Sequence, residues 1–290
     1  MAVSGGPDSL ALLLLAAARP GLEIEAATVD HGLRPESAGE AVMVADLCGQ
    51  LGVPHAILPV RVEPVGNLQA QARTARYAAL GGWMRERGLA ALATAHHVED
   101  QAETLVMRLN RASGLAGLAG IRARGTLPGG TGLVLRPLLT MRRSTLRGIV
   151  DAAGIAAVDD ASNHDDRFDR ARIRKALGQA DWIDAEGMAA SASYLAEADE
   201  ALDWAVRLAW DRLVVARPGG FDYRPEAPRV ISLRLLAGIL ESMGEHGQRG
   251  SAVARLYDGL SDGRVMSLGS VVARPGRAEW HFRQAPARRH

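Results

Sequence analysis

The sequence has little cysteine and lysine, and it lacks long hydrophobic runs. Cys48 is the single cysteine among 290 residues, which excludes a disulfide framework, a Cys-x-x-Cys redox pair and any all-cysteine metal site. Lys175 is the single lysine, so arginine carries nearly all of the positive charge and offers bidentate contacts to phosphate. The longest apolar run, Leu10–Ala18, is too short to span a bilayer and follows no basic stretch. We therefore expect neither a membrane helix nor a signal peptide. We expect the protein to be cytoplasmic.

Hydrophobic residues make up 48% of the chain, enough for a full core in one large domain and a smaller one. We place the large domain at residues 1–178 and the smaller one at 179–290. Apolar β-type runs alternate with helical patterns in the first part, which predicts an α/β fold with a doubly wound, mostly parallel sheet. The smaller domain is expected to be mainly helical and to end in a β-hairpin of Val265–Val272 and Glu279–Arg283 around Pro275-Gly276. The runs are Leu22–Val29, His55–Val60 and Leu89–Ala93, followed by helices Ala38–Leu51, Leu68–Arg87 and Val98–Arg111.

The stub Met1–Val3 is expected to be the central strand of the sheet. It is shorter than the usual five to six residues or so of a strand, which predicts that further residues precede Met1. A glycine-rich loop follows the stub and leads into a helical run, an arrangement that holds phosphates with backbone N–H groups at a helix N-terminus. An aspartate in such a loop indicates a divalent cation between it and the anion. The loop residues are Ser4, Gly5, Gly6, Pro7, Asp8 and Ser9.

Polar residues also follow the second and fourth strands of the expected sheet. Asp30 and His31 end one strand, and His96 and His97 end the other. Ligands bind outside the carboxyl ends of the strands in open α/β sheets, so these residues and the loop are expected around one crevice. Asp30 or His31 could contact the adenosine of a bound nucleotide or the divalent cation, although Asp30 also suits a turn or helix cap.

Asp100 and Glu103 lie three residues apart in a predicted helix and therefore share a face. Two carboxylates there could bind Mg²⁺, take up the ammonium of a substrate amine, or deprotonate that amine. The adjacent histidines do not have the spacing of a zinc helix. Acidic residues in a first helical turn also simply favour the helix dipole.

Positive charge is concentrated in the middle of the chain. Residues 111–175 contain 12 basic and 6 acidic side chains, a balance of +6, whereas residues 1–110 contain 8 against 12 and residues 176–290 contain 14 against 15. Such clustering is typical of a surface that binds a polyanion.

Eight motifs occur in order and give the chain its most specific pattern. They are S-G-G-P-D-S at 4–9, V-D-H-G-L-R at 29–34, A-R-x-x-R-Y at 72–77, A-H-H-x-x-D-Q-x-E-T at 95–104, R-x-S-G-x-x-G-L at 111–118, R-P-L-L at 136–139, D-x-S-N at 160–163 and R-x-R-I-R at 170–174. This pattern resembles that of the tRNA(Ile)-lysidine synthetases, a family of N-type ATP pyrophosphatases. The resemblance covers nearly all of residues 1–178 and only loosely the remainder.

The resemblance implies an adenine nucleotide alpha hydrolase-like PP-loop domain and a two-step reaction. The wobble cytidine of a CAU-anticodon tRNA(Ile) attacks the α-phosphorus of ATP, pyrophosphate leaves, and free L-lysine then displaces AMP to give lysidine. Ser4, Gly5, Gly6, Pro7 and Ser9 would hold the pyrophosphate, with Asp8 on Mg²⁺ and Asp30, His31 and His96 toward the nucleotide. Asp100 and Glu103 would position and deprotonate the lysine amine, and Arg76 would face the ATP or the adenylated base.

The same resemblance implies that the basic segment binds the anticodon stem and loop through phosphates. The expected tRNA-binding residues are Arg111, Arg136, Arg142, Arg143, Arg172 and Arg174, and the C-terminal part would grip more distant tRNA. Three positions depart from the family pattern: Glu99 replaces an aspartate, Ala112 a glycine and Ala171 an asparagine. None of them removes a group of the phosphate loop.

Three alternative functions are considered at this point. A tRNA thiolase with the same loop also adenylates a base, but it needs catalytic cysteines or an iron–sulfur cluster, and Cys48 stands alone. A non-catalytic adenine-nucleotide or RNA-binding module is disfavoured by the intact Asp8, Asp100 and Glu103. Small-molecule ligases with this loop, such as NAD or GMP synthetases, need neither the basic segment nor the later motifs.

Overall fold

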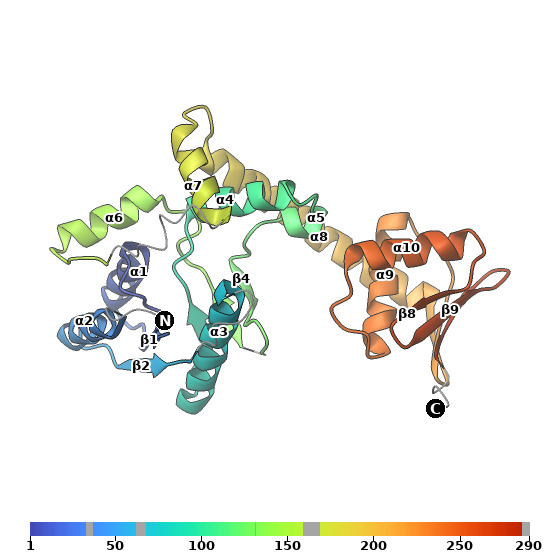
Figure 1. Cartoon of the computed structure of the whole chain (residues 1–290), viewed down its shortest axis with the longest axis horizontal. Helices are drawn as coiled ribbons and strands as arrows, with labels where there is room; N and C mark the ends of the chain where they lie inside the picture. Colours follow the sequence, from blue (N-terminus) through green and yellow to red (C-terminus); the bar gives the residue numbers. More distant parts are fainter. Residues whose placement is uncertain (33–36, 62–67, 131, 159–168, 286–290) are drawn as a thin grey trace. The chain divides into compact units, whose positions relative to one another are not determined.

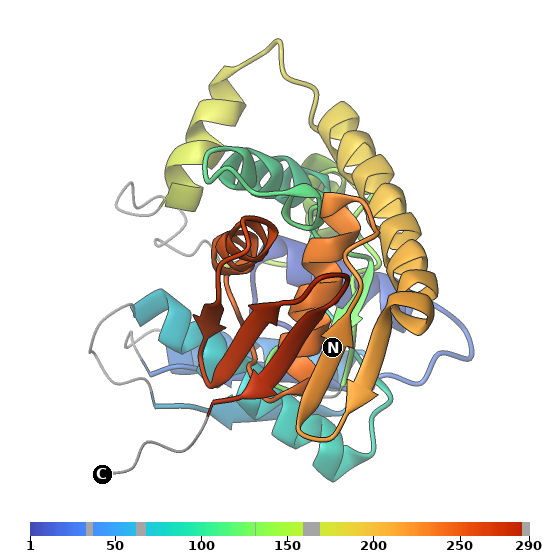
Figure 2. The same cartoon turned by 90° about the vertical axis from the view of Figure 1, so that its right-hand side faces the viewer.

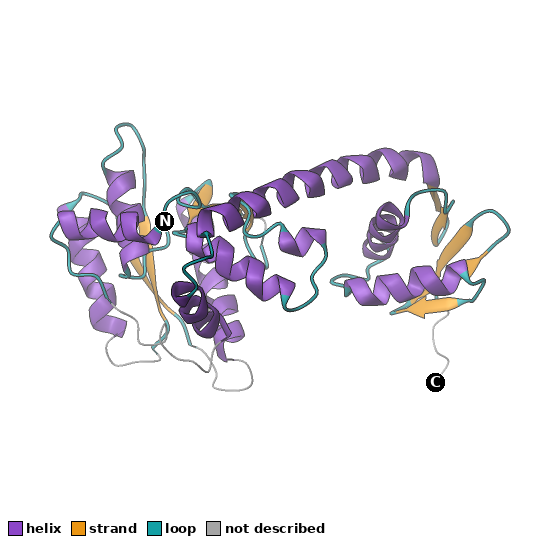
Figure 3. Ribbon diagram, turned by 90° about the horizontal axis from the view of Figure 1, so that it is seen from above, coloured by secondary structure: helices purple, strands orange, loops and turns teal. Residues whose placement is uncertain are grey.

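The computed structural model describes residues 1–32, 37–61, 68–130, 132–158 and 169–285. The chain divides into two compact units, Met1–Ala196 and Glu197–His290, here called unit 1 and unit 2. The division falls within the long helix α8 (Ala185–Leu213), which is continuous across it (Figure 3). The functional boundary that we placed after residue 178 stays a prediction.

Unit 1 contains the mostly parallel sheet expected from the sequence. β1 (Ala26–Asp30) pairs in parallel with β2 (His55–Pro59), and β3 (Ala91–Ala93) pairs in parallel with β5 (Leu133–Leu135). The short β4 (Arg124–Thr126) adds an antiparallel strand beside β5.

The stub of residues 1–3 joins the two groups of strands and is central, as predicted. The Val3 N–H donates to the Ala27 carbonyl over 2.9 Å, and the Ala27 N–H donates back to Met1 over 2.9 Å. On the other side, the Ala2 N–H donates to the Ala93 carbonyl over 3.0 Å. The hydrogen-bonded order is therefore β2, β1, residues 1–3, β3, β5 and β4.

Helices cover both faces of this sheet, which makes it doubly wound (Figure 1). One core holds Val3, Leu13, Val44 and Leu146, and so joins α1, α2 and α6 to one face. The opposite core packs α3 against the strands through its buried aromatic and aliphatic side chains. The helices of unit 1 before α8 are α1 (Pro7–Ala17), α2 (Ser37–Gln50), α3 (Leu68–Arg87), α4 (Val98–Leu109), α5 (Leu115–Leu118), α6 (Arg143–Ala152) and α7 (Asp169–Gln179).

Unit 2 packs helices on one face of a five-stranded antiparallel sheet, whose strands face the viewer in Figure 2. The predicted terminal hairpin is present as β9 (Val271–Pro275) and β10 (Trp280–Gln284). Three further strands complete the sheet in the order β6, β7, β10, β9, β8. The sequence analysis missed β6 (Val214–Arg217) and β7 (Gly220–Tyr223), and it included β8 (Met266–Leu268) in the first strand of the hairpin.

The core of unit 2 explains why one face of its sheet is apolar. Tyr223 and Phe282 are fully buried and lie on neighbouring strands, where they pack against Leu236 of α9 (Arg229–Ser242) and Leu256 of α10 (Gly250–Ser261). Successive strand residues point to opposite faces, so the intervening polar residues of β7 and β10 face away from this core. Among the described residues, no helix is both long and apolar enough to cross a membrane.

Candidate active site

The glycine-rich loop leaves the central stub and enters α1 in a fixed conformation. Gly5 has a φ of +82°, a value that favours glycine, and a Cβ there would lie 3.3 Å from Val158. Ser9 accepts a hydrogen bond from the Ser4 N–H over 3.1 Å and donates one to the Gly6 carbonyl over 2.9 Å. Pro7 begins the helix, where its missing N–H costs nothing. The loop therefore presents the N-terminus of α1 at the end of the central strand.

His97 connects this loop to α4. Its side chain is 3% exposed, and its Nε2 atom lies 3.5 Å from Asp8 Oδ2 and 3.6 Å from Asp100 Oδ2. Its Nδ1 atom lies 2.9 Å from Glu99 Oε2. His97 is also the N-cap residue of α4, and its backbone N–H donates to Asp100 over 3.0 Å. Three carboxylates from two elements thus surround one imidazole.

The charges around His97 shift two pKa values in opposite directions. Burial by itself would lower the pKa of His97, but bonding to Asp8 and Glu99 and the charge of Asp100 outweigh it and raise the pKa to about 9. Burial would raise the pKa of Glu99, but His97 and the Arg143 N–H lower it to about 2. At neutral pH the ring is therefore a cation and Glu99 an anion. Glu99 also accepts from the Arg143 N–H over 3.0 Å at the start of α6.

Asp100 and Glu103 face α7, and two arginines of that helix bind them. Arg170 donates to Asp100 over 2.5 Å and to Glu103 over 2.6 Å. Arg174 donates to the other oxygen of Glu103 over 2.6 Å. The Glu103 side chain is 2% exposed, so this carboxylate is buried as an ion pair. The acidic pair predicted from the sequence thus shares one face of α4, and it is occupied by cationic groups of the chain itself.

His96 lies among positive charges beside this cluster. Its Nδ1 atom is 3.0 Å from Thr94 Oγ1. Burial lowers the pKa of His96 to about 4, and the charges of Arg136, Arg170 and Arg76 act in the same direction. Its ring is therefore neutral at pH 7, in contrast to that of His97. A neutral imidazole can both donate and accept a hydrogen bond.

Arg76 of α3 acts on His31 and His96, two of the histidines that the sequence analysis placed around the crevice. Burial lowers the pKa of His31, and the charge of Arg76 lowers it further. The Arg76 guanidinium also lies 5.3 Å from the centre of the Tyr77 ring. Arg73 is exposed and its guanidinium lies 4.9 Å from the centre of the same ring.

Asp30 makes local bonds that fit the capping role left open for it. Its Oδ1 atom accepts from the Gly32 N–H over 2.9 Å and from the Ser37 hydroxyl over 2.7 Å at the start of α2. These bonds lower the pKa of Asp30. A contact of Asp30 with adenosine or metal stays a prediction. The motif at 160–163 and residues 33 and 34 of the second motif lie outside the described residues.

The arginines expected to bind tRNA divide into two groups. Arg111 and Arg172 are exposed and pair with Asp169, and Arg142 is exposed and pairs with Glu186 over 2.5 Å. Arg136 and Arg174 are half-buried and make bonds inside unit 1, Arg136 to the Arg122 carbonyl over 2.7 Å. The side chain of Arg143 is half-buried, and the backbone N–H of the same residue donates to Glu99. Exposure suits Arg111, Arg142 and Arg172 best for phosphate binding, and the tRNA role of all six stays a prediction.

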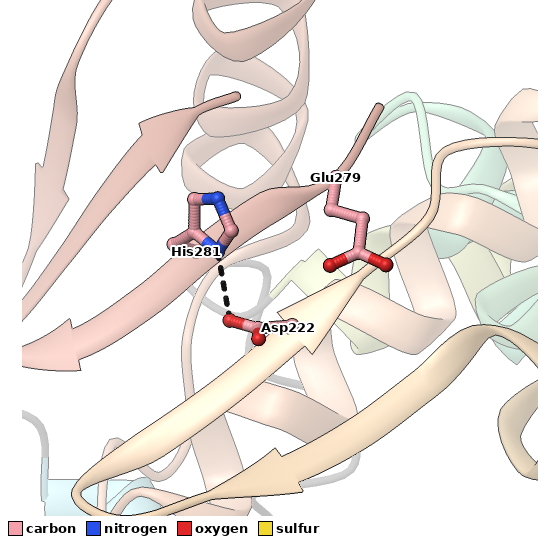
Figure 4. Close-up of side chains that lie close together, drawn as sticks. All are labelled: Asp222, Glu279 and His281. Atoms are coloured by element: carbon pink, nitrogen blue, oxygen red, sulfur yellow. Dashed lines mark hydrogen bonds and ion pairs between the residues drawn. The ribbon is translucent and has the colours of Figure 1, made fainter. Parts of the chain in front are cut away.

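A second cluster of titratable groups lies on the sheet of unit 2. Asp222, Glu279 and His281 each offer a ligand atom within 4.8 Å of the others (Figure 4). However, Asp222 already accepts bonds from His281 over 2.8 Å, from Arg283 over 2.8 Å and from Arg217 over 2.9 Å. Two guanidinium groups on one carboxylate oppose a metal ion there, so we assign this cluster to the stability of the sheet.

The parallel sheet and its phosphate-type loop define unit 1 as a nucleotide-binding α/β domain of the PP-loop class. The PP-loop domain family matches residues 1–181. A tRNA(Ile)-lysidine synthase of Novosphingobium aromaticivorans is 47% identical over 100% of this chain and 89% of its own length. One of Zymomonas mobilis subsp. mobilis is 43% identical over 100% of this chain and 89% of its own. The chain belongs to the tRNA(Ile)-lysidine synthase family.

A solved structure supports the fold alone. The U34-tRNA thiolase NcsA from Methanococcus maripaludis, with its [4Fe-4S] cluster, has a TM-score of 0.54 and 16% identity. The similarity covers 67% of this chain and 69% of the thiolase. This similarity confirms the predicted α/β fold, and the family match confirms its PP-loop class.

The sequence analysis did not assign two residues that the structure places in the cluster. His97 was expected near the crevice without a role, and Arg170 was counted in the basic segment of residues 111–175 rather than with the acidic pair. A signal for Arg170 is present in the sequence, because Arg170 and Arg174 are four residues apart and share a helix face. Two arginines on one helix face could pair with the two carboxylates, Asp100 and Glu103, on one face of α4. However, nothing in the sequence indicates that α4 and α7 are neighbours.

Proposed function

We propose that the protein ligates free L-lysine to C2 of the wobble cytidine of CAU-anticodon tRNA(Ile), with cleavage of ATP to AMP and pyrophosphate. The observation that carries this proposal is the convergence of the loop aspartate, Asp8, with the acidic face of α4 at His97. A site for cleaving ATP and a site for a cationic amine thus meet at one edge of the sheet. A cytoplasmic location, where ATP and tRNA are available, belongs to the same proposal.

The loop is suited to the pyrophosphate that leaves in the first step. The backbone N–H groups at the start of α1 and the hydroxyls of Ser4 and Ser9 are donors for its oxygens. Asp8 fits a Mg²⁺ ion carried with ATP, because its buried Oδ1 atom accepts no hydrogen bond from the described residues. When bound there, Mg²⁺ would neutralise charge that develops on the leaving group. Asp8 would hold it, and His97 would keep Asp8 in place.

The acidic pair is suited to the amine of lysine. Asp100 and Glu103 already bind guanidinium groups, so this acidic face of α4 is suited to cations. A protonated amine cannot attack, and one of these carboxylates would take its proton before the amine displaces AMP from the adenylated cytidine. The C–N bond forms as the bond between C2 and the AMP oxygen breaks. The division of roles between Asp100 and Glu103 is part of the proposal.

The tRNA supplies the remaining substrate. A cytosine must leave its base stack before its C2 position can react, so the wobble base is expected to turn into the crevice. Arg76 would contact the adenylated base or the ATP, a role supported by its effect on His31 and His96. The exposed Arg111, Arg142 and Arg172 would bind the backbone of the anticodon stem and loop.

A tRNA thiolase is the second candidate, and the single cysteine disfavours it. Cys48 is fully buried in the core beside α1, and burial raises the pKa of its thiol. A thiol of that kind is a poor nucleophile, and one cysteine cannot hold an iron–sulfur cluster.

The decisive experiment incubates the protein with labelled ATP, lysine and CAU-anticodon tRNA(Ile). We expect AMP, pyrophosphate and lysine-modified tRNA in equal amounts. A tRNA with another anticodon is the control and should yield none of them. Release of ADP without lysine, or sulfur in the tRNA, would contradict the proposal.

Two variants separate the two steps. Asp8→Asn should abolish pyrophosphate release, because the leaving group loses its charge neutralisation. Glu103→Gln should retain part of the pyrophosphate release but slow lysine transfer by about 100-fold or more, the usual range for a general base. Equal loss of pyrophosphate release in both variants would show that the roles are not divided in this way.

A further inference from the structure

His97 joins residues that are far apart in the chain. Asp8 stands in the first turn of α1, and Asp100 stands in the first turn of α4. The Nε2 atom of His97 lies between their carboxylates, 3.5 Å from Asp8 Oδ2 and 3.6 Å from Asp100 Oδ2. The Nδ1 atom is engaged separately, 2.9 Å from Glu99. The two ring nitrogens therefore serve different partners.

The two oxygens of Asp8 are placed differently by this contact. Oδ2 faces the His97 ring, whereas Oδ1 is buried and accepts no hydrogen bond from the described residues. A buried carboxylate oxygen without a partner is costly unless a ligand or cation satisfies it. The side of Asp8 away from His97 is thus the side that is prepared for a ligand.

We propose that His97 is a positioning residue for Asp8: its Nε2 atom holds Asp8 Oδ2, so that Oδ1 is presented to the divalent cation that accompanies ATP. This inference rests on the proposed use of ATP, but it concerns the first step only. It assigns the loop aspartate a fixed rotamer that the loop alone does not impose. Within the described residues, His97 is the polar side chain that contacts Asp8.

Electrostatics explains why such a residue is needed. Asp8 and Asp100 are carboxylates that both approach one ring nitrogen, and without the ring they would repel each other. Asp8 would then turn toward solvent, because its side chain is 26% exposed and has room to move. Groups that orient a metal-binding carboxylate typically change metal affinity by about 10-fold to 100-fold when they are removed.

A purely structural role for His97 makes a different prediction. His97 is the N-cap of α4, and asparagine is among the best N-cap residues. His97→Asn keeps a polar group near the position of Nδ1, toward Glu99, and loses the one at Nε2. His97→Gln reaches the position of Nε2, toward Asp8. If His97 only caps the helix, the asparagine variant should therefore perform at least as well as the glutamine variant.

The test measures ATP binding by calorimetry in the full-length protein, once with Mg²⁺ and once with EDTA. Bound Mn²⁺ is counted in parallel by its electron paramagnetic resonance signal in the presence of ATP. We expect His97→Gln to keep the increase in ATP affinity that the metal gives, and His97→Asn to reduce this increase by about 10-fold or more. The metal-free affinity should change little in either variant. His246→Gln, at an exposed position of unit 2, is the matched control.

Asp8→Asn provides a second arm that does not depend on the stability of the His97 variants. In the Asp8→Asn background, His97→Asn should cause no further loss of Mn²⁺ binding, because the group that it positions is already gone. Additive losses would overturn the proposal, as would a His97→Asn variant that retains the metal effect. A wild-type protein whose ATP affinity does not respond to metal would also overturn it. The proposed function fails separately, if metal-dependent ATP binding occurs but no lysine enters the tRNA.

Discussion

Asp222 is a single residue whose ionisation is tied to the stability of unit 2. Burial alone would raise the pKa of this carboxyl, but bonds from His281, Arg283 and Arg217 outweigh burial and lower the pKa to about 2. The pKa of an unfolded aspartate is about 3.9. The native state therefore takes up the proton at a lower pH than the unfolded state does. The stabilisation is therefore present above about pH 4 and is lost as the pH falls through about 2.

This gives a prediction for acid unfolding. Between about pH 4 and pH 2 the free energy of unfolding of unit 2 should fall by about 2 kcal/mol on account of Asp222. Asp222→Asn should be less stable at pH 7 and should lack this part of the pH dependence. The free energy of unfolding of both proteins is measured by urea unfolding, with hydrogen exchange in β7 and β10 as the probe. Parallel pH profiles for the two proteins would contradict the assignment.

Individual site residues were predictable from the sequence to different degrees. Asp8, Asp100 and Glu103 could be found because a loop or a helix turn fixes where they point. His97 could not be given a role, because its function depends on the contact between Asp8 and α4. Adjacent histidines also look alike in a sequence, although in the structure one of them is a cation and the other is neutral.

At the scale of elements, α7 is held in place mainly by charge. Ala171 is the one buried residue among the described positions of α7, so the helix has little apolar surface to anchor it. Arg170 and Arg174 instead bind the buried carboxylates of α4, and Figure 1 shows the two helices together. Such docking competes with any cation that binds Asp100 or Glu103.

The corresponding prediction concerns the double variant Arg170→Ala/Arg174→Ala. It leaves Glu103 as a buried charge without its partners, which typically costs about 3 kcal/mol or more. Hydrogen exchange in residues 169–179 should accelerate by about 100-fold, the factor that corresponds to this energy. Arg172→Ala, which removes only an exposed pair with Asp169, is the control and should change little. Unchanged exchange in the double variant would show that α7 is held by other contacts.

Elements with a strong pattern were predicted well, and short ones were not. The helical runs that became α1, α3 and α4 were visible because of their length and apolar spacing. β6 was missed because it begins directly where α8 ends, at Val214, without a breaking residue between them. β8 and β9 were expected as one strand, whereas a turn at Gly269, with a φ of +59°, separates them. Such boundaries depend on pairing partners that lie elsewhere in the chain.

At the scale of the whole molecule, the chain contains separate hydrophobic cores joined by one continuous helix. Leu13 is fully buried in unit 1 among residues of α1, α2 and α6. Leu236 is fully buried in unit 2 among residues of α9, α10 and the antiparallel sheet. α8 contributes Ala192 to the buried residues of unit 1 and Leu213 to the core of unit 2. Separate cores favour separate unfolding transitions.

Two matched variants test this independence. Leu13→Ala and Leu236→Ala each remove the same side chain from a fully buried site, which typically costs about 2–5 kcal/mol. We expect Leu13→Ala to accelerate hydrogen exchange in α1 and α6 while leaving α9 and β10 unchanged, and Leu236→Ala to do the reverse. Because α8 runs through both units, its two halves should follow their own unit, with the change of behaviour near residues 196 and 197. If either variant destabilised both units equally, the helix would transmit unfolding and the protein would be one cooperative unit.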